Sequence, residues 1–163
     1  MRTKILFMWQ RKQTLFLIIA FLLNFSLFFM EIASIQAGTL SYSFDILGLE
    51  TLSDQGTTHF STYLLIPLVA FSLLLTLLVI LLYKRRQLQI KLAQLNLFIQ
   101  LVLVAAIFYL AEEAIENIPW DGEATIKYVY GTYISLLPII MIYAAIRFIK
   151  KDEALIRAAD RIR

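Results

Sequence analysis

The feature that most constrains this chain is an uncharged stretch, Leu64–Tyr83, which ends abruptly at Lys84-Arg85-Arg86. A helix rises 1.5 Å per residue, so a stretch of about twenty residues reaches roughly 30 Å, the thickness of a bilayer's hydrocarbon core. Basic side chains that close such a stretch indicate the end held on the cytoplasmic side. The stretch therefore predicts a transmembrane helix with its C-terminal end in the cytoplasm.

The composition excludes a water-soluble globule and several kinds of chemistry. Hydrophobic residues make up 60% of the 163 residues and charged ones 17%, with a mean hydropathy of +0.75; soluble domains average about 25% charged. The chain has no cysteine, so it has no disulfide, thiolate nucleophile or cysteine-based metal or redox site. With His59 as its one histidine, it also lacks the usual histidine metal motifs.

Three further apolar stretches predict three more helices. We therefore expect an all-α integral membrane protein, a bundle of four transmembrane helices forming a single domain of residues 1–163. The predicted segments are the spans 14–32, 64–83, 92–111 and 128–149, the outer loops 33–63 and 112–127, the inner turn 84–91 and the cytoplasmic tail 150–163. The tail either continues the fourth helix or lies along the membrane.

The first outer loop is predicted to contain a small β-hairpin. Leu40–Ile46 alternates apolar and polar residues, as in a half-buried strand, and Thr58–Thr62 alternates in the same way and could pair with it. The first span also resembles a signal peptide, with a weak cleavage site at Ile35-Gln36-Ala37. Its apolar run exceeds the usual 7–15 residues of such peptides, so we expect a retained helix. Met1 and Met8 both remain possible starts.

The distribution of charge predicts the orientation. In this arrangement the N-terminal segment, the inner turn and the region from Arg147 onward hold fourteen of the fifteen basic residues, Lys127 being the exception. Nine of the twelve acidic residues, counting Glu31 at the end of the first span, fall on the outer side. Because Lys and Arg stay on the cytoplasmic side, both termini are predicted to be cytoplasmic. The inner face attracts anionic lipids first, and it would also suit ribosomal RNA or an acidic protein. The predicted binding residues on this face are Arg11, Lys12, Lys84, Arg85, Arg86, Lys150, Lys151, Arg157 and Arg161.

Polar and small residues inside the predicted spans are interpreted as helix-packing positions. Amides in a bilayer need partners on neighbouring helices, and small residues let helices approach closely. Proline within a span bends its helix. The predicted packing residues are Asn24, Asn96, Gln100, Gly131, Ser135 and Pro138. Two alternatives stay open: Asn24 could coordinate a solute, and the stripe formed by Gln89, Ala93, Asn96 and Gln100 could line a water-filled crevice.

The second outer loop is strongly acidic, which raises the question of a metal site. It contains Glu112, Glu113, Glu116, Asp121 and Glu123, but their spacing lacks the ligand alternation and glycine of an EF-hand. A solvated charged face is the simpler interpretation. Glu112, Glu113, Glu116 and His59 are also the only candidates for catalysis, and they form no recognisable catalytic motif. We therefore predict no metal, no cofactor, no catalytic residue and no enzymatic activity.

Two stretches carry a resemblance to a known family. Gln10-Arg11-Lys12-Gln13-Thr14-Leu15-Phe16-Leu17 and the C-terminal Lys151–Arg163 are similar to those of small, uncharacterised bacterial inner-membrane proteins with four spans, catalogued as a domain of unknown function. The resemblance implies a multi-pass protein of the inner membrane of a double-membraned bacterium, and it implies no activity. The layout is also similar to that of claudin-type tetraspans, but the tryptophan and cysteine motif of their first loop is missing.

Two functional hypotheses follow. The first is a non-enzymatic accessory or scaffold subunit of a larger membrane assembly for protein translocation, secretion or envelope biogenesis. Its basic inner face would dock a cytoplasmic or membrane partner, and its outer loop a periplasmic one; the sequence identifies no small-molecule substrate. The alternative is a small oligomeric transporter or channel, whose pore would be lined by Asn24, Gln100, Thr132 and Ser135.

Overall fold

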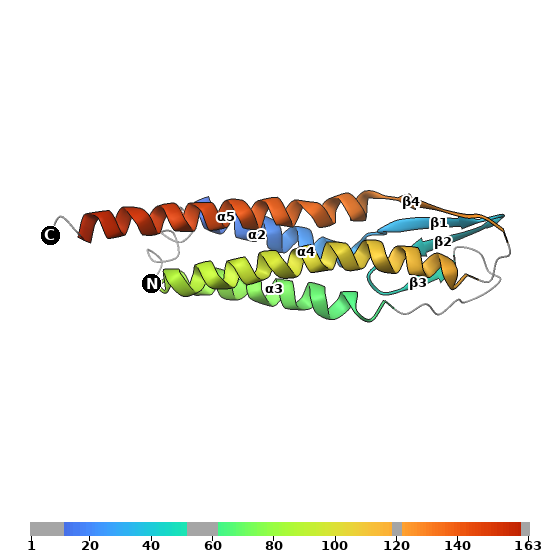
Figure 1. Cartoon of the computed structure of the whole chain (residues 1–163), viewed down its shortest axis with the longest axis horizontal. Coiled ribbons are helices and arrows are strands. Elements are labelled where there is room, and N and C mark those ends of the chain that lie inside the picture. Colours follow the sequence, from blue (N-terminus) through green and yellow to red (C-terminus); the bar gives the residue numbers. More distant parts are fainter. Residues whose placement is uncertain (1–11, 52–61, 119–121, 161–163) are drawn as a thin grey trace.

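The computed structural model describes residues 12–51, 62–118 and 122–160 and shows an elongated molecule (Figure 1). The described helices are α2 (Lys12–Ser26), the short 3₁₀ turn η1 (Leu27–Phe29), α3 (Leu65–Leu81), α4 (Arg86–Glu116) and α5 (Tyr130–Asp160). The described strands are β1 (Ala33–Ala37), β2 (Leu40–Phe44), β3 (Leu49–Thr51) and β4 (Ala124–Tyr128). The helices lie side by side, and the strands form a sheet at one end of them.

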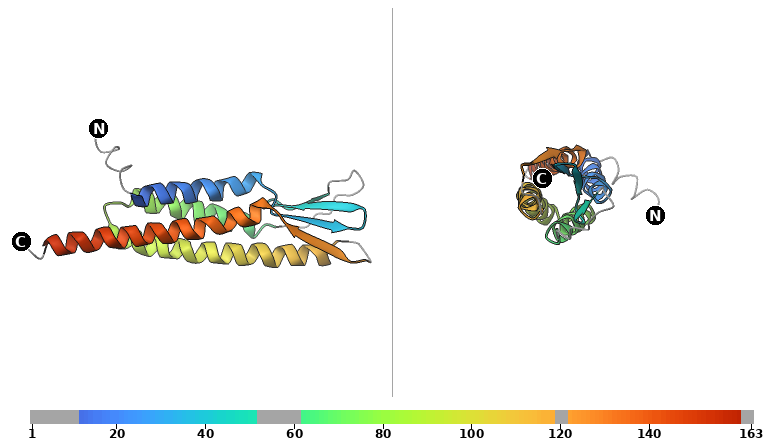
Figure 2. Two further views of the ribbon diagram at one scale, coloured as in Figure 1. Left: turned by 90° about the horizontal axis from the view of Figure 1, so that it is seen from above. Right: turned by 90° about the vertical axis from the view of Figure 1, so that its right-hand side faces the viewer.

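The four long helices form a closed ring in which each packs against two neighbours of opposite direction. The main contacts join α2 to α3, α3 to α4, α4 to α5 and α5 back to α2, and the end-on view shows this arrangement (Figure 2). The short turn between α3 and α4, the start of α2 and the end of α5 lie at the end away from the sheet. Consecutive helices joined at alternate ends give this up-and-down order.

The sheet is antiparallel, with strand order β3-β2-β1-β4. A two-residue loop, Gly38-Thr39, joins β1 to β2, and Gly38 has φ 61°, a left-handed conformation that suits the first position of a tight hairpin. β4 pairs with β1 over its whole length, from Ala33 opposite Tyr128 to Ala37 opposite Ala124. Because β4 pairs with β1 and α5 begins two residues after β4, the sheet places the chain that follows η1 next to the start of α5.

The core consists of two apolar clusters at different heights. The larger one lies where the sheet meets the helices, and the C-terminal half of α4 supplies Leu103, Ile107 and Ala111 to it beside Ile35 and Phe44 of the sheet. The smaller one lies nearer the other end of the bundle. Its buried members are Leu17, Ala20, Val79, Ala93, Ile142, Ala145, Ile146 and Ile149. Between these clusters each of the four long helices buries at least one polar side chain.

The predicted all-α bundle of four transmembrane helices is wrong. Among the described helices only α4 and the Tyr130–Leu155 part of α5 are long and apolar enough to cross a membrane, judged by length and composition. The 15 residues of α2 and the 17 of α3 reach roughly 22 and 26 Å, short of the roughly 30 Å needed. Within the predicted first span, 14–32, the α-helix ends at Ser26, whose hydroxyl donates to the Leu23 carbonyl oxygen at 2.8 Å.

The β structure is also larger than predicted. Four strands replace a small hairpin, and they come from both predicted outer loops, because β4 lies within 124–128. In the described residues the neighbours of β2 are β1 and β3, whereas the predicted partner, Thr58–Thr62, lies outside the described residues except for Thr62. α5 runs without a break to Asp160, so residues 150–160 of the predicted tail continue this helix.

Candidate functional site

A layer of polar side chains, hereafter the polar layer, fills the centre of the helical ring. Every helix contributes to it, and each member has 0% of its surface exposed. The members are Asn24 of α2, Ser72 and Thr76 of α3, Asn96 and Gln100 of α4, and Ser135 of α5. Buried polar groups are costly unless they are hydrogen-bonded, so the partners of each side chain decide what the layer does.

Ser72 is the hub of the polar layer. Its Oγ accepts a hydrogen bond from Asn24 Nδ2 at 3.2 Å and lies within donating distance of Asn96 Oδ1 at 2.9 Å and Gln100 Oε1 at 3.1 Å. Asn96 Nδ2 in turn donates to Thr76 Oγ1 at 2.8 Å, and Thr76 Oγ1 donates to the Ser72 carbonyl oxygen at 2.8 Å. The layer therefore joins α2, α3 and α4 through side chains alone.

Gln100 extends the polar layer to the fourth helix. Its Oε1 accepts from Asn24 Nδ2 at 3.1 Å, and its Nε2 donates to the Ser135 carbonyl oxygen of α5 at 3.1 Å. One turn earlier in α5, Thr132 Oγ1 donates to the carbonyl oxygen of Ile32 at 2.6 Å. A continuous series of hydrogen bonds thus leads from the middle of the bundle to the first residue before β1.

The polar layer has one more hydrogen-bond acceptor than its donors can satisfy. Asn24 Oδ1 is buried and has no partner, and the single Ser72 hydroxyl hydrogen can serve only one of its two acceptors at a time. Nearer the other end of the bundle, the buried Gln89 donates from Nε2 to the Val79 carbonyl oxygen at 2.9 Å, while its Oε1 and that of Gln13 are unpartnered. The stripe that could have lined a crevice therefore faces the protein interior.

Gly131 allows α5 to start directly against the chain that leads into β1. Its backbone N–H donates to the Glu31 carbonyl oxygen at 3.1 Å. A Cβ at this position would overlap that oxygen and would lie 3.1 Å from Cα of Ile32. The predicted small residue is thus packed against backbone at the junction of sheet and helices. Pro138, also predicted as a packing residue, lies within α5 and is buried.

Tyr128 marks the same junction from the side of β4. Its ring packs edge-on against Phe108 of α4, with 5.0 Å between the ring centroids. Burial raises the pKa of the Tyr128 hydroxyl above its ordinary value of 10.0, and the nearby Glu112 carboxylate raises it further because a second negative charge is disfavoured there. The phenol is therefore neutral at physiological pH.

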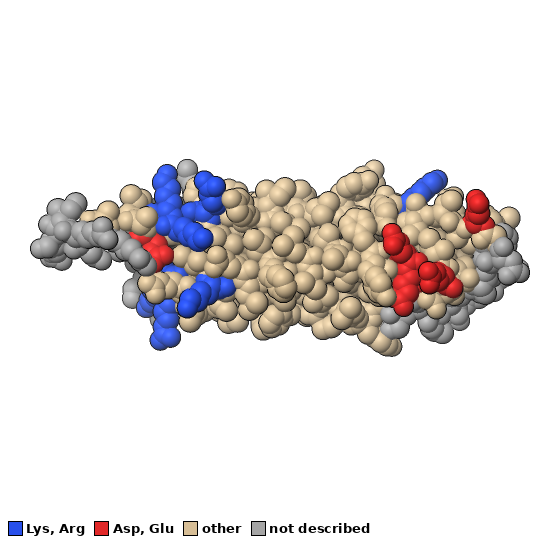
Figure 3. All heavy atoms as spheres, in the orientation of Figure 1, with Lys and Arg blue, Asp and Glu red and all other residues tan. Residues whose placement is uncertain are grey.

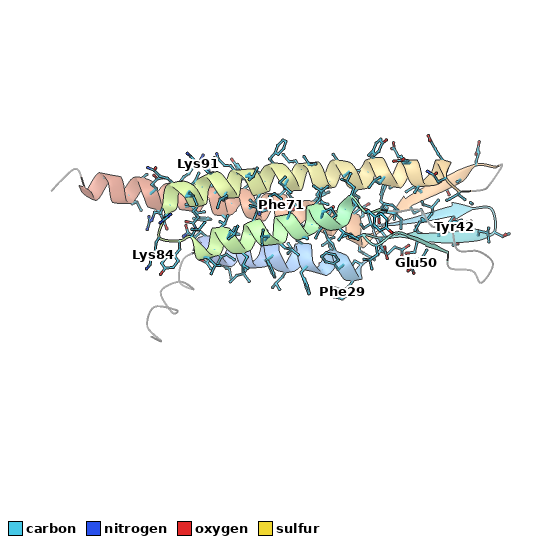
Figure 4. All side chains as sticks on the ribbon, turned by 90° about the horizontal axis from the view of Figure 1, so that it is seen from below. Phe29, Tyr42, Glu50, Phe71, Lys84 and Lys91 are labelled. Atoms are coloured by element: carbon cyan, nitrogen blue, oxygen red, sulfur yellow. The ribbon has the colours of Figure 1, made fainter. Side chains whose placement is uncertain are left out.

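Charge is separated between the two ends of the molecule (Figure 3). The end away from the sheet, hereafter the basic end, carries the exposed Lys84, Arg85, Lys91, Lys150 and Lys151 and the half-buried Arg86. Of the other residues predicted for this face, Arg11 and Arg161 and the side chains of Lys12 and Arg157 lie outside the described part. In Figure 4, Lys84 and Lys91 lie at this end, and Tyr42 and Glu50 at the other.

The sheet end carries most of the described acidic residues. Glu112, Glu116 and Glu123 are exposed and Glu113 is half-buried, whereas Asp121 and His59 lie outside the described residues. Within the described residues, no three histidine, aspartate or glutamate side chains are grouped so that they could hold a metal ion.

Between the charged ends the helices expose an uncharged apolar surface, hereafter the apolar belt. Phe71 on α3 illustrates it, lying along the helices between the two ends (Figure 4). The large exposed apolar side chains of the belt include Leu15, Leu22, Phe25, Phe71, Leu74, Leu77, Leu78, Leu81, Leu95, Phe98, Leu101, Val102, Tyr109, Tyr133, Leu136, Leu137, Ile140 and Tyr143. Monomeric soluble proteins rarely expose so continuous an apolar surface.

Sequence reasoning missed Ser72 and Thr76. It singled out Asn24, Asn96 and Gln100, which the structure brings together, but not the hydroxyls that connect them. The available signal was their spacing: they are four residues apart, so they share one face of a helix that is otherwise entirely apolar. The four residues proposed to line a pore, Asn24, Gln100, Thr132 and Ser135, lie inside a single chain and are at most 2% exposed.

These features define a class of protein: a helical bundle with an apolar exterior, a polar interior layer and an antiparallel sheet at one end, with two helices long enough to cross a membrane. Within that class the chain belongs to the family described as Domain of unknown function (DUF4293), whose model matches residues 9–162. The match agrees with the expected membership of an uncharacterised family. The two sequence stretches on which that expectation was based stay untested, as does its bacterial origin.

A comparison with curated proteins finds no match for the chain. The family description names no substrate or activity. The function therefore has to be argued from the charges, the apolar belt and the polar layer.

Proposed function

We propose that the protein is a non-enzymatic accessory subunit of a bacterial inner-membrane assembly, embedded through its helical part. The observation that carries this proposal is the apolar belt between two oppositely charged ends. Only 28% of the apolar window of α4 and 39% of that of α5 are buried within the chain. The core helix of a soluble protein would be mostly buried, so these exposed faces call for lipid or for other membrane proteins around them.

The proposed orientation places the basic end in the cytoplasm and the sheet in the periplasm. α4 and α5 then cross the bilayer in opposite directions, with α2 and α3 packed beside them. Exposed lysines and arginines favour the cytoplasmic side, and the start of α2 and the end of α5 both lie at the basic end. Both termini are therefore proposed to be cytoplasmic. The acidic sheet end suits the opposite side.

An accessory role is supported by two chemically different docking surfaces. The basic end suits anionic lipid headgroups, an acidic protein or ribosomal RNA. The sheet has β4 as an outer strand, and outer strands can pair with a segment of a partner. We propose protein translocation, secretion or envelope biogenesis as the process that the assembly serves.

Site-specific photo-crosslinking in cells tests this proposal. A photoreactive residue replaces Lys84 at the basic end or Glu50 of the sheet, both of which are exposed. Each position is expected to give a discrete adduct with a protein partner, and the two partners should differ. Phe71, exposed on the apolar belt, is the matched control position. A chain that forms no protein adduct at Lys84 or Glu50 and purifies alone from gently solubilised membranes would contradict the proposed role.

The orientation has a separate test, made simple by the absence of native cysteine. Single-cysteine variants Glu50→Cys and Lys84→Cys are labelled with a membrane-impermeant maleimide in spheroplasts. Glu50→Cys should react with intact spheroplasts, and Lys84→Cys only after they are lysed. The reverse pattern would show that the proposed orientation is inverted.

The alternative of an oligomeric transporter draws no support from the polar layer. A pore between copies would need Asn24 and Gln100 on the outer surface, but both are fully buried and hydrogen-bonded to each other. Solute flux through proteoliposomes of the native protein tests this alternative: flux above that of protein-free liposomes would favour a transporter, and flux equal to theirs would support the accessory role.

A further inference from the structure

We propose that a groove between α4 and α5 at the basic end holds the phosphate headgroup of an anionic phospholipid. Gln87, Lys91 and Gln94 of α4 face Lys150 of α5 across this groove, which has a volume of about 590 Å³. Ile90 and Ala154 supply apolar surface between them. The proposal rests on the membrane position proposed above and deepens it by naming a ligand.

The lining of the groove suits a phosphate group. Lys91 and Lys150 are both exposed and come from facing helices, and the two glutamine amides add neutral N–H donors. Ammonium groups make strong, charge-assisted hydrogen bonds to phosphate oxygens. Glu153 also lines the groove and interacts with another group of the protein. Two lysines against one glutamate leave the lining with a positive formal charge.

The height of the groove matches that of lipid headgroups. From Lys91 toward the sheet, Leu92–Ala111 contains no charged residue and spans roughly 30 Å. On α5 the stretch from Tyr130 to Ile146 is likewise uncharged. The groove therefore lies about one hydrocarbon thickness from the acidic end, at the level where phosphates stand when the apolar belt is in the bilayer.

An apolar path for acyl chains leads away from the groove. One and two helical turns beyond Gln94, on the same side of α4, lie Phe98 and Leu101, which are 61% and 51% exposed. On α5, the exposed Arg147 lies one turn from Lys150 and donates to the Tyr143 hydroxyl at 3.4 Å, and Ile140, beyond it, is 60% exposed. A free phosphate would make no use of this apolar surface, whereas the chains of a phospholipid would cover it. This feature favours a lipid over a soluble phosphate as the source of the headgroup.

Lipid titration of the purified full-length protein in detergent tests the proposal. Native mass spectrometry measures binding of short-chain phosphatidylglycerol and of phosphatidylcholine. The double variant Lys91→Gln/Lys150→Gln is expected to bind phosphatidylglycerol roughly thirtyfold more weakly, about 2 kcal/mol, since each lysine contributes about 1 kcal/mol near an anionic surface. The matched control Lys84→Gln/Arg85→Gln removes the same charge outside the groove and should weaken binding less than threefold.

Several results would overturn the proposal. Equal losses in the two double variants would mean diffuse attraction to the whole basic end. Equal binding of phosphatidylcholine, or displacement of the lipid by equimolar inorganic phosphate, would rule out recognition of an anionic phospholipid. The charge-preserving Lys91→Arg/Lys150→Arg should retain binding, and a loss as large as that of the glutamine variant would overturn the proposal, since binding would then not depend on positive charge at these two positions. Because the assay needs no protein partner, its failure is distinguishable from failure of the photo-crosslinking experiment.

Discussion

Replacing Ser72 by alanine should destabilise the helical bundle by removing the hub of the polar layer. The hydroxyl accepts one hydrogen bond from Asn24 and donates one toward either Asn96 or Gln100. Asn24 Nδ2 keeps its bond to Gln100 Oε1 in the variant. Asn96 Oδ1, in contrast, loses its donor while remaining fully buried. The substitution therefore removes two hydrogen bonds and leaves one new buried acceptor without a partner.

The magnitude follows from these changes. Each lost hydrogen bond is worth about 0.5–1.5 kcal/mol, and a buried group left unsatisfied costs about 1–3 kcal/mol. Side-chain hydrogen bonds between helices in membranes average about 0.6 kcal/mol. Since the loss and the desolvation overlap, we expect Ser72→Ala to lower the free energy of unfolding by about 2 kcal/mol.

Equilibrium unfolding in mixed micelles, driven by sodium dodecyl sulfate and followed by circular dichroism, measures this quantity. Ser26→Ala is the matched control, because the Ser26 hydroxyl bonds only the Leu23 carbonyl oxygen within α2. That control should change the free energy of unfolding by less than about 0.5 kcal/mol. If Ser72→Ala is no more destabilising than Ser26→Ala, the polar layer does not hold the helices together, and our interpretation of it is wrong.

Three further predictions use the same unfolding assay. Gln100→Leu should lower the free energy of unfolding more than Asn24→Leu. Gln100 is hydrogen-bonded to residues of three other helices, whereas Asn24 already has an unpartnered side-chain carbonyl oxygen. The reverse order would contradict the hydrogen bonding described for the polar layer. Gly131→Ala should lower the free energy of unfolding by about 1–3 kcal/mol, as at other overpacked sites, because the new Cβ overlaps the Glu31 carbonyl oxygen. An unchanged free energy of unfolding would argue against this close contact. The raised pKa of Tyr128 contributes stability that is complete below pH 10.0 and is lost as pH rises through the raised value. Tyr128→Phe should therefore show a smaller alkaline loss. Glu112→Gln, which brings the pKa of folded Tyr128 closer to 10.0, should also make the loss smaller and complete it at lower pH; identical alkaline profiles would refute this.

The positions of the helices could be predicted from the sequence, but their lengths could not. The uncharged stretches predicted where helices form, and the structure has a helix in each. Apolar character continues beyond Ser26 through η1 into β1, so hydropathy alone cannot mark where α2 ends. The alternation of Ala33, Ile35 and Ala37 with polar residues, followed by Gly38-Thr39, was the local signal for the β1–β2 hairpin.

The composition of the polar layer was only partly predictable for a similar reason. Amides are rare within apolar stretches and therefore draw attention, as Asn24 and Gln100 did. Serine and threonine are common in helices and usually bond their own backbone, as Thr76 does. Nothing local shows that Ser72 also reaches two other helices. The pairing of β1 with β4 depends in the same way on contacts between residues almost a hundred positions apart.

The polar layer and the apolar belt have a common physical explanation. If the belt lies in lipid, helices gain little by burying apolar side chains against each other, because the lipid tails are equally apolar. Specific association must then come from close packing and from hydrogen bonds between helices. The protein has both: small residues such as Ala93 and Ala145 in one cluster, and the polar layer next to it. Besides its apolar clusters, the protein therefore buries a polar layer and exposes leucine and phenylalanine on the belt, an arrangement that suits a lipid environment.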